Sequence, residues 1–461
     1  MPVSYLTERQ ASPAAFNWSS ITPSCRLQYH DCFNGFRCAR LKVPLDWSVA
    51  NSSDCEGALR SAAIGIVTLP ATVPETDPSF GGTVLINPGG PGGSGTGMVR
   101  SLGPYFQNIL KGERNYEILG FDPRGVAIST PRADCYNSPA DRAADGNARY
   151  GMASLDNEVG RRYYYQDRLA LSELCGRQGP GSILNHMSTA SVARDMLEII
   201  DRVDELRHGN LTSSGKKPGL QYLGFSYGTH IGNTFASMFP GRVERMVLDG
   251  VTNSKDYVNG DERETLRDVE AVIDFFYDTC FEAGVNCPLW QSSDAGGSDI
   301  KGRVNAFIDG LVEAPIPIAS RMYEAMTAQS RTVSEPWVRY VTSCAQWKYN
   351  PPYAFRGPFG HKHLDTSQSG NMPAAPPLIL SARYDVSTPL ANAYALEKLY
   401  PGSAVVIQES YGHLALGSSP SNCTNNYVRT YFETGKLPPT GSTCSDDCPA
   451  EIPARPCPGY I

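Results

Sequence analysis

The segment 220–240 constrains the fold of this chain more than any other part of its sequence. It predicts a short apolar strand, a one-residue corner and a helix, and the corner carries the pattern Gly224-Phe225-Ser226-Tyr227-Gly228. A serine in a sharp strand-to-helix turn needs neighbours without a Cβ atom two positions away, because side chains there would make the strand and the helix collide. The pattern predicts that Ser226 is held outward as a nucleophile, and a glycine-rich turn without chemistry is the alternative.

The helix after this corner has a matching pattern. Gly228, Gly232 and Ala236 stand four positions apart, so they form one small-residue face that could lie close on a sheet. The N-terminus of this helix lies behind Ser226, where it would favour developing negative charge. Both features support the interpretation of Ser226 as a nucleophile.

Short apolar strands alternate with helices on both sides of this segment. The other expected strands are residues 62–69, 83–87, 116–121, 245–248, 377–382 and 404–408. Apolar residues at steps of three and four indicate an amphipathic helix over 191–206, whereas 133–188 is rich in loops and hard to assign. The alternation predicts an α/β fold, with a mostly parallel sheet covered by helices on both faces.

The pattern changes after the strand 245–248. Residues 252–374 indicate helices and loops without a buried strand, so we interpret them as an inserted helical lid. The lid would divide the core into 56–251 and 375–461, and residues 1–55 are expected to be an irregular, cysteine-containing lead-in. A chain of 461 residues can hold all of this as one large domain with insertions. After the helix at 266–280, aromatic residues of the expected lid include Trp290, Trp337, Tyr340, Trp347, Tyr349, Tyr353, Phe355 and Phe359.

Two further residues complete a catalytic constellation. Asp385 follows the strand 377–382 and His413 follows the strand 404–408, so both stand at carboxyl ends of strands, where open α/β sheets place ligands. A serine hydroxyl needs a base to take its proton and a carboxylate to orient that base. The order Ser226, Asp385, His413 therefore predicts nucleophile, acid and base. Asp249, after the strand 245–248, is the reserve acid, and its other interpretation is a turn residue.

A glycine-rich loop follows the strand 83–87. Residues 88–95, PGGPGGSG, leave the backbone N–H groups unobstructed, so the loop could cradle a phosphate or an oxyanion. The loop is not a phosphate-binding P-loop, because no Gly-Lys-Ser/Thr follows it. After the next strand, we interpret the charged residues Asp122 and Arg124 as a structural link rather than as catalytic groups.

The chain resembles the α/β-hydrolase fold and, within it, the tripeptidyl and prolyl aminopeptidase group of serine peptidases. The motifs that carry the resemblance are NPGGPGGSG at 87–95, FDPRG at 121–125, GFSYG at 224–228, VLDG at 247–250, YDVSTP at 384–389 and YGH at 411–413. The C-terminal region, with Cys423 and with GKLPPTG at 435–441 before Cys444, resembles that of tripeptidyl-aminopeptidase-like members. The resemblance covers residues 40–445.

This resemblance implies specific roles for residues of the chain. It implies that Ser226 is the nucleophile, Asp385 the acid and His413 the base. It places an oxyanion hole at the backbone N–H groups of Tyr227 and of the Gly89-Gly90 turn. It implies a secreted protein with the disulfides Cys280–Cys287, Cys423–Cys444 and Cys135–Cys175. Neither a metal nor an organic cofactor is implied, because such a triad needs none.

Composition narrows the partners of the chain. The formal net charge is −7 and no run is rich in Lys and Arg, which argues against nucleic acid. No segment has 18 consecutive apolar residues, so no membrane span is expected. The expected partner is a peptide or a small-molecule amide or ester, and the oligomeric state is left open.

The number of cysteines indicates whether the protein is secreted or intracellular. Thirteen cysteines are many for a reduced cytosolic enzyme, and no C-x-x-C pair suggests zinc, so disulfides are the better interpretation. Residues 1–24 lack the apolar core of a signal peptide. A secreted protein is expected from the cysteines and the resemblance, and an intracellular protein is the alternative. In a secreted glycoprotein the N-x-S/T acceptors would be Asn17, Asn51, Asn210 and Asn422, although chance also produces such sites.

Three functions remain open from the sequence. The chain could be an exopeptidase that cuts near a free amino end, an esterase, amidase or acyl-transfer enzyme for a small secondary metabolite, or an inactive binding protein. An intact Ser-Asp-His set argues against the third, and a fold cannot decide between the first two. The stretch 256–282 has five Asp and four Glu against two Arg. In a lid it could hold a cationic α-amino group, or it could be the solvated face of the helix at 266–280.

Overall fold

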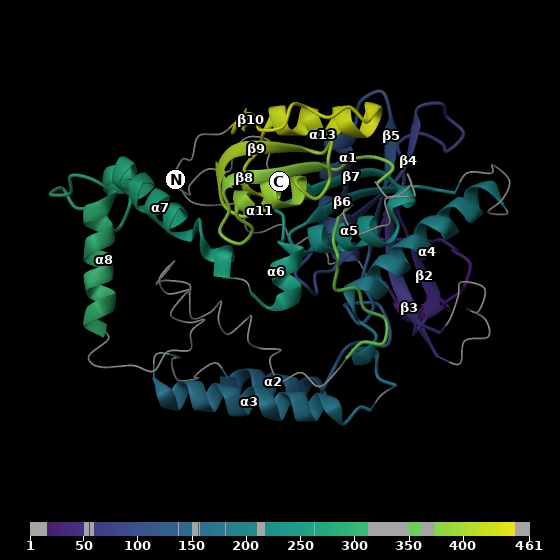
Figure 1. Cartoon of the computed structure of the whole chain (residues 1–461), viewed down its shortest axis with the longest axis horizontal. Helices are drawn as coiled ribbons and strands as arrows, with labels where there is room; N and C mark the ends of the chain where they lie inside the picture. Colours follow the sequence, from purple (N-terminus) through teal and green to yellow (C-terminus); the bar gives the residue numbers. More distant parts are fainter. Residues whose placement is uncertain are drawn as a thin grey trace.

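The computed structural model of the chain describes residues 16–49, 55, 60–136, 138–149, 155, 157–179, 181–209, 217–261, 263–311, 350–360 and 373–447. In these residues the chain forms one large sheet with helices on both of its faces (Figure 1). None of the described helices combines the length and the apolar character that crossing a bilayer would require.

The sheet has ten strands in the order β1-β2-β3-β5-β4-β6-β7-β8-β9-β10. From β1 to β5 neighbouring strands are antiparallel, and from β5 to β10 they are all parallel. The prediction of a mostly parallel sheet is confirmed, and each predicted strand corresponds to one observed strand. From β1 to β10 the bounds are His30–Cys32, Phe36–Pro44, Ser61–Leu69, Phe80–Asn87, Asn115–Phe121, Leu220–Phe225, Val243–Asp249, Leu378–Tyr384, Ala404–Tyr411 and Ser442–Ser445.

Helices bury both faces of this sheet. On one face lie α1 (Gly95–Leu110) and α13 (Asn422–Thr434), and on the other lie α4 (Thr189–His208), α5 (Tyr227–Met238) and α11 (Leu390–Glu397) (Figure 1). Successive strand residues face opposite sides, so Val84 joins one hydrophobic core and Leu85 the other. The predicted amphipathic helix over 191–206 is α4, whose apolar side is buried against the sheet.

Two expectations from the sequence are wrong. The lead-in is not irregular throughout, because residues 30–44 form β1 and β2 at one edge of the sheet. Three basic residues interrupt the apolar ones in β2, FRCARLKVP, which hides the pattern of a strand. The segment 133–188 contains the helices α2 (Pro139–Arg149) and α3 (Glu158–Gly176). Only three residues of α3 are buried, so it has no apolar stripe by which the sequence could reveal it.

The described residues of the expected lid form helices and loops and contain no strand. They contain α6 (Ser254–Asn259), α7 (Val269–Ala283) and α8 (Gly297–Leu311), and α7 and α8 extend to one side of the sheet in Figure 1. The ring of Phe275 on α7 stacks on Tyr411 of β9, with 3.9 Å between the ring centroids. The boundaries 252–374 stay a prediction. Of the aromatic residues named above, Trp337, Tyr340, Trp347 and Tyr349 lie outside the described residues.

The three disulfides implied by the resemblance are all present. They join Cys135 to Cys175, Cys280 to Cys287 and Cys423 to Cys444. Two further disulfides, Cys25–Cys55 and Cys32–Cys38, lie in the lead-in. The cysteines at 344, 448 and 457 lie outside the described residues.

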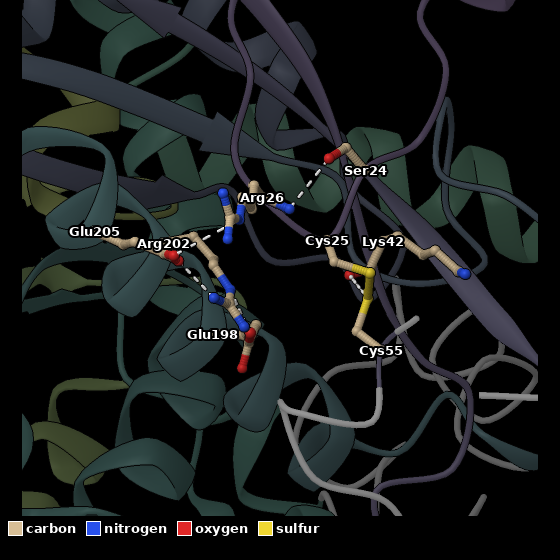
Figure 2. Close-up of a disulfide and its surroundings, with 8 residues drawn as sticks. All are labelled: Ser24, Cys25, Arg26, Lys42, Cys55, Glu198, Arg202 and Glu205. Carbon is tan, nitrogen blue, oxygen red and sulfur yellow. Dashed lines mark hydrogen bonds and ion pairs between the residues drawn. A yellow bond between two sulfur atoms is a disulfide. The ribbon is translucent and has the colours of Figure 1, made fainter. Parts of the chain in front are cut away.

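The lead-in is fixed to the rest of the fold around Cys25. Figure 2 shows the Cys25–Cys55 disulfide beside β2. Here Ser24 pairs with β2, since its carbonyl accepts from the N–H of Lys42 at 2.8 Å. The Arg26 guanidinium lies 4.0 Å from the Glu205 carboxylate of α4. The lead-in is thus joined both to the edge of the sheet and to a helix that covers it.

A buried ion pair confirms the structural interpretation of Arg124. The guanidinium donates to both carboxylate oxygens of Asp195 on α4, at 2.7 and 2.6 Å, and both side chains are almost fully buried. It also donates to the carbonyls of Leu45 and His186. Trp47 donates its indole N–H to Asp195 at 2.8 Å. The pair therefore ties the loop after β5 to α4 and to the chain after β2.

Removing one partner of this pair should be strongly destabilising. We expect Arg124→Met to lower the free energy of unfolding by about 3–5 kcal/mol, because it leaves the Asp195 carboxylate buried without its counter-charge. The double variant Arg124→Met/Asp195→Leu should lose less, since no charge is then stranded. Urea unfolding measures both. The exposed pair Arg383–Glu409 provides the control, and Arg383→Gln should change stability little. Equal losses in Arg124→Met and Arg383→Gln would contradict the expectation.

Candidate active site

The predicted corner at Ser226 is present between β6 and α5. Ser226 has φ 54° and ψ −126°, a left-handed conformation that a residue with a side chain rarely adopts. Its N–H donates to the carbonyl of Asp249 at 3.0 Å, which ties the corner to the end of β7. A Cβ atom at Gly228 would lie 2.6 Å from the carbonyl of Asn87. The glycine is therefore required by a close approach of backbone to backbone.

Asp385 and His413 lie together, as the sequence predicts. Nδ1 of His413 lies 2.8 Å from one carboxylate oxygen of Asp385 and 3.1 Å from the other. Asp385 is fully buried and accepts from the N–H groups of Ser387, Thr388 and Leu414 at 2.8–2.9 Å. With Nδ1 protonated and donating to Asp385, Nε2 of His413 is left free to accept a proton.

The charges of Asp385 and His413 shift the pKa of both side chains. Burial alone would raise the pKa of Asp385, but the hydrogen bond and positive charge of His413, with two backbone N–H donors, hold it below its usual value. Burial alone would lower the pKa of His413. The hydrogen bond and charge of Asp385, together with the charge of Asp249, outweigh burial and raise that pKa above its usual value. The carboxylates therefore favour the protonated imidazole.

Thr388 is a site residue that the sequence reasoning missed. Its hydroxyl donates to Asp385 Oδ2 at 2.7 Å and lies 3.3 Å from Nδ1 of His413. Its place three residues after Asp385, in YDVSTP, was the available signal, because a Ser or Thr close after an Asp often shares a turn with it. Thr388 helps to hold the carboxylate toward the imidazole.

Asp249 is neither the acid that contacts His413 nor a simple turn residue. It is fully buried, and its two carboxylate oxygens accept from the N–H groups of Ala415 and Leu416 at 2.7 and 2.9 Å. It therefore does not bond the imidazole of His413 but holds the backbone just after it. Burial raises the pKa of Asp249 to about 6, although the two N–H donors act in the opposite direction.

Ser226 and Thr388 line the same small pocket, which has a volume of about 50 Å³. Thr388 in turn contacts His413. Among the described residues Ser226 Oγ has no hydrogen-bond partner, so the bond between the serine and the imidazole is not formed. Hydrogen bonds of this kind often tighten only when substrate is present. Gly90 and Tyr227 also line the pocket.

The structure corrects one part of the expected oxyanion hole. The N–H of Gly89 already donates to the side-chain oxygen of Asn87 at 2.9 Å, so Gly89 is not a free donor. The backbone N–H groups of Gly90 and Tyr227 have no acceptor among the described residues, and Tyr227 is the first residue of α5. Gly89 instead provides the close approach between the loop and the corner, where a Cβ atom would lie 2.7 Å from Tyr227 N.

Three carboxylates of the acidic stretch line the same pocket as Ser226: Asp256, Asp261 and Glu264. Asp261 accepts two hydrogen bonds from Arg263, at 2.6 and 2.7 Å, and Glu264 pairs with Arg267. The Asp256 carboxylate has no partner among the described residues. Partial burial raises the pKa of Asp256, and the charges of Asp261 and Glu264 add to that shift. The charges of Lys255 and Arg263 act in the opposite direction, but the Asp256 carboxylate forms no ion-pair contact with a described residue.

His230 is a structural residue. Its Nδ1 lies 2.8 Å from Ser254 Oγ, and burial lowers its pKa to about 4, so the ring is neutral at pH 7. Within the described ranges, no group of three or more His, Cys, Asp or Glu residues is placed to hold a metal ion.

Comparisons with known proteins agree with this geometry. Residues 330–444 match the family described as TAP-like protein. Serine protease Hip1 from Mycobacterium tuberculosis is 32% identical over 302 residues, which are 62% of this chain and 48% of that protein. The chain thus spans about half of the length of this relative.

Two more similarities extend over most of the chain. Tripeptidyl aminopeptidase from Streptomyces lividans is 24% identical over 445 residues, covering 79% of this chain and 77% of that protein. The solved structure of an acetylester hydrolase from Corynebacterium glutamicum is 12% identical and covers 87% of this chain and 96% of its own, with a TM-score of 0.39. The observed parallel sheet and the corner at Ser226 agree with the α/β fold expected from the sequence, and residues 330–444 are similar to the TAP-like family.

Proposed function

We propose that the chain is a serine hydrolase that cleaves amide bonds near the free N-terminus of peptides through an acyl-enzyme. The observation that carries this proposal is the Asp256 carboxylate, which lies in the same pocket as Ser226 and has no ion-pair partner among the described residues. The relatives named serine protease and tripeptidyl aminopeptidase support the peptidase class.

In the first half of the reaction, Ser226 Oγ attacks the scissile carbonyl carbon while Nε2 of His413 takes the hydroxyl proton. The negative charge that forms on the carbonyl oxygen would be held by the N–H groups of Gly90 and Tyr227 and by the N-terminus of α5. His413 then gives its proton to the leaving nitrogen, the C–N bond breaks and the acyl group stays on Ser226. Asp385 keeps the imidazole oriented and stabilises its positive charge.

In the second half, a water molecule takes the place of the leaving amine. His413 removes one proton from the water as its oxygen attacks the acyl carbon, and then returns that proton to Ser226 Oγ. The products are a carboxylic acid and the free enzyme. A binding pocket that holds the amino end of the peptide would determine which bond lies at Ser226.

Asp256 is our proposed ligand for the α-amino group. That amine is cationic below its pKa, which is about 8 in peptides. Asp261 and Glu264 already face arginines, so Asp256 is the carboxylate available to a substrate. The alternative is that Asp256 only contributes to a solvated acidic surface, in which case a metabolite esterase or amidase becomes the better proposal.

We also propose that the protein acts outside the cytosol. The described residues hold five disulfides, and such bonds persist in oxidising compartments. Two of the predicted glycan acceptors, Asn17 and Asn422, are exposed, and those at 51 and 210 lie outside the described residues.

Covalent labelling tests the proposed nucleophile. A fluorophosphonate probe should label the protein once, and Ser226→Ala should abolish labelling because the probe then has no activated hydroxyl. His413→Ala should lower kcat by about 10³-fold or more, since the members of such a triad act as a unit. Intact-mass measurement gives the stoichiometry. Labelling that survives Ser226→Ala would show that the nucleophile is another residue.

The pH dependence of kcat/KM tests how Asp249 acts on His413. Activity needs the neutral imidazole, so the acid limb of the profile reports the pKa of His413. Because the Asp249 charge raises that pKa, Asp249→Asn should move the acid limb to lower pH. It should also lower kcat about tenfold through misplacement of the imidazole.

Asp31→Asn, at an exposed position on β1, is the matched control and should leave the profile in place. Thermal unfolding checks that both variants fold. If Asp249→Asn lowers the plateau but leaves the acid limb where it was, Asp249 has only a structural role and no electrostatic effect on His413.

A substrate panel tests the amine site. Tripeptidyl anilides with a free amine should be cleaved at least about tenfold better in kcat/KM than their N-acetylated forms. Asp256→Asn should remove most of this preference, because the difference of about 1.4 kcal/mol comes from the carboxylate. Asp278→Asn, in the same acidic stretch but outside the pocket, should keep the preference. Equal cleavage of free and acetylated substrates by the wild type would contradict the peptidase proposal.

A further inference from the structure

A second cavity lies next to the pocket that holds Ser226. It has a volume of about 340 Å³, at the lower end of the range for small-molecule sites. Thr252, Asn253 and Asn392 line both the cavity and the pocket, so the two are neighbours. We call it the side cavity, and its walls come from the start of α6, from α11 and from residues 356–359. Nothing in the mechanism above uses it.

The floor of the side cavity is apolar. Val251, Phe359 and Leu396 line it, and each is buried in the fold. Two polar side chains of the wall bond within the protein, since Asn233 donates to Ser254 Oγ at 2.8 Å, and Asn233 also accepts from Tyr400 at 2.5 Å. A floor of this composition favours an apolar side chain over a charged one.

Asn392 is a further polar residue of the cavity wall. Only 7% of this residue is exposed, and it lines both the side cavity and the pocket of Ser226. In the part of the chain that the structure describes, its side-chain amide has no hydrogen-bond partner. A ligand in the cavity would give this amide a hydrogen-bond partner.

Two cations line the same cavity. Lys255 and Arg356 are both exposed, and neither forms an ion pair with any described residue. No Asp or Glu is among the described residues of the cavity wall. The short helix α6 separates the charges, because Lys255 lines the side cavity while the next residue, Asp256, lines the pocket of Ser226.

We propose that the side cavity binds the C-terminal residue of a short peptide, with an apolar side chain on its floor and a free carboxylate at Lys255 and Arg356. The Asn392 amide donates a hydrogen bond to the same residue. This inference rests on the proposed function, in which Asp256 binds the α-amino group. The preferred substrate is then a short peptide with both termini free and an apolar last residue, held across α6 with its scissile bond at Ser226.

Binding to Ser226→Ala protein tests the proposal without turnover. The probes are Gly-Pro-Ala-Leu as the free acid, the same peptide as its C-terminal amide, and Gly-Pro-Ala-Lys as the free acid. Calorimetry should show the Leu free acid binding at least about tenfold more tightly than either of the other two. Equal affinities of the Leu acid and its amide, or no binding of any probe, would overturn the proposal.

Variants of the cavity wall assign the effect to the named residues. Adding Lys255→Gln and Arg356→Gln should abolish the preference for the acid, and Lys436→Gln, at an exposed position in the C-terminal region, should keep it. Asn392→Asp places a negative charge in the wall and should reverse the preference toward the amide. Ala395→Trp fills the cavity and should remove the preference for Leu over Lys. A preference for the acid that survives Lys255→Gln/Arg356→Gln would overturn the assignment.

Turnover by the wild type separates this proposal from the proposed function. If free-amine peptides are cleaved but the Leu acid and amide react equally, the side cavity does not bind the C-terminal carboxylate. The proposed peptidase function then still stands. If the Ser226→Ala protein prefers the acid while the wild type cleaves esters but no peptide, the peptidase function fails and the binding site stands.

Discussion

The close approach of two backbone segments at the carboxyl edge of the sheet is the constraint on which the site depends. Gly89 has φ +86°, and a Cβ atom there would lie 2.4 Å from the carbonyl of Phe225. A Cβ atom at Gly228 would likewise lie too close to the carbonyl oxygen of Asn87. Because backbone contacts backbone here, the loop after β4 lies directly against the corner after β6. That contact brings the N–H groups of Gly90 and Tyr227 to the pocket of Ser226.

Two buried carboxylates organise the other half of the site. Three consecutive N–H groups after His413 are held, that of Leu414 by Asp385 and those of Ala415 and Leu416 by Asp249. Leu414 has φ 75°, a strained conformation that these bonds maintain. Burying two acids close together is unfavourable, as the raised pKa of Asp249 shows, and the N–H donors offset part of that cost. Such an arrangement orients the imidazole without relying on one contact.

Charge is divided across the short helix α6. The pocket at Ser226 has carboxylates in its wall, whereas Lys255 and Arg356 line the side cavity. Neighbouring side chains on a helix point in different directions, so one turn of α6 can present opposite charges to two cavities. In our proposals, this separation gives a direction to a peptide that lies across the helix, with its amine on one side and its carboxylate on the other.

The sequence by itself determined the parallel sheet, the corner at Ser226 and the positions of Asp385 and His413, because these depend on local periodicity, on glycine spacing and on strand ends. It did not reveal α3, whose surface is mostly solvated, or β2, whose basic residues hide its alternation. Only the tertiary structure showed that Asp385, and not Asp249, lies at Nδ1 of His413, since both residues follow buried strands. It also showed that Asn87 occupies the N–H of Gly89, and that Asp249 bonds a backbone 166 residues away. Contacts at such a separation depend on how the strands are ordered in the sheet, which no single segment of the sequence specifies.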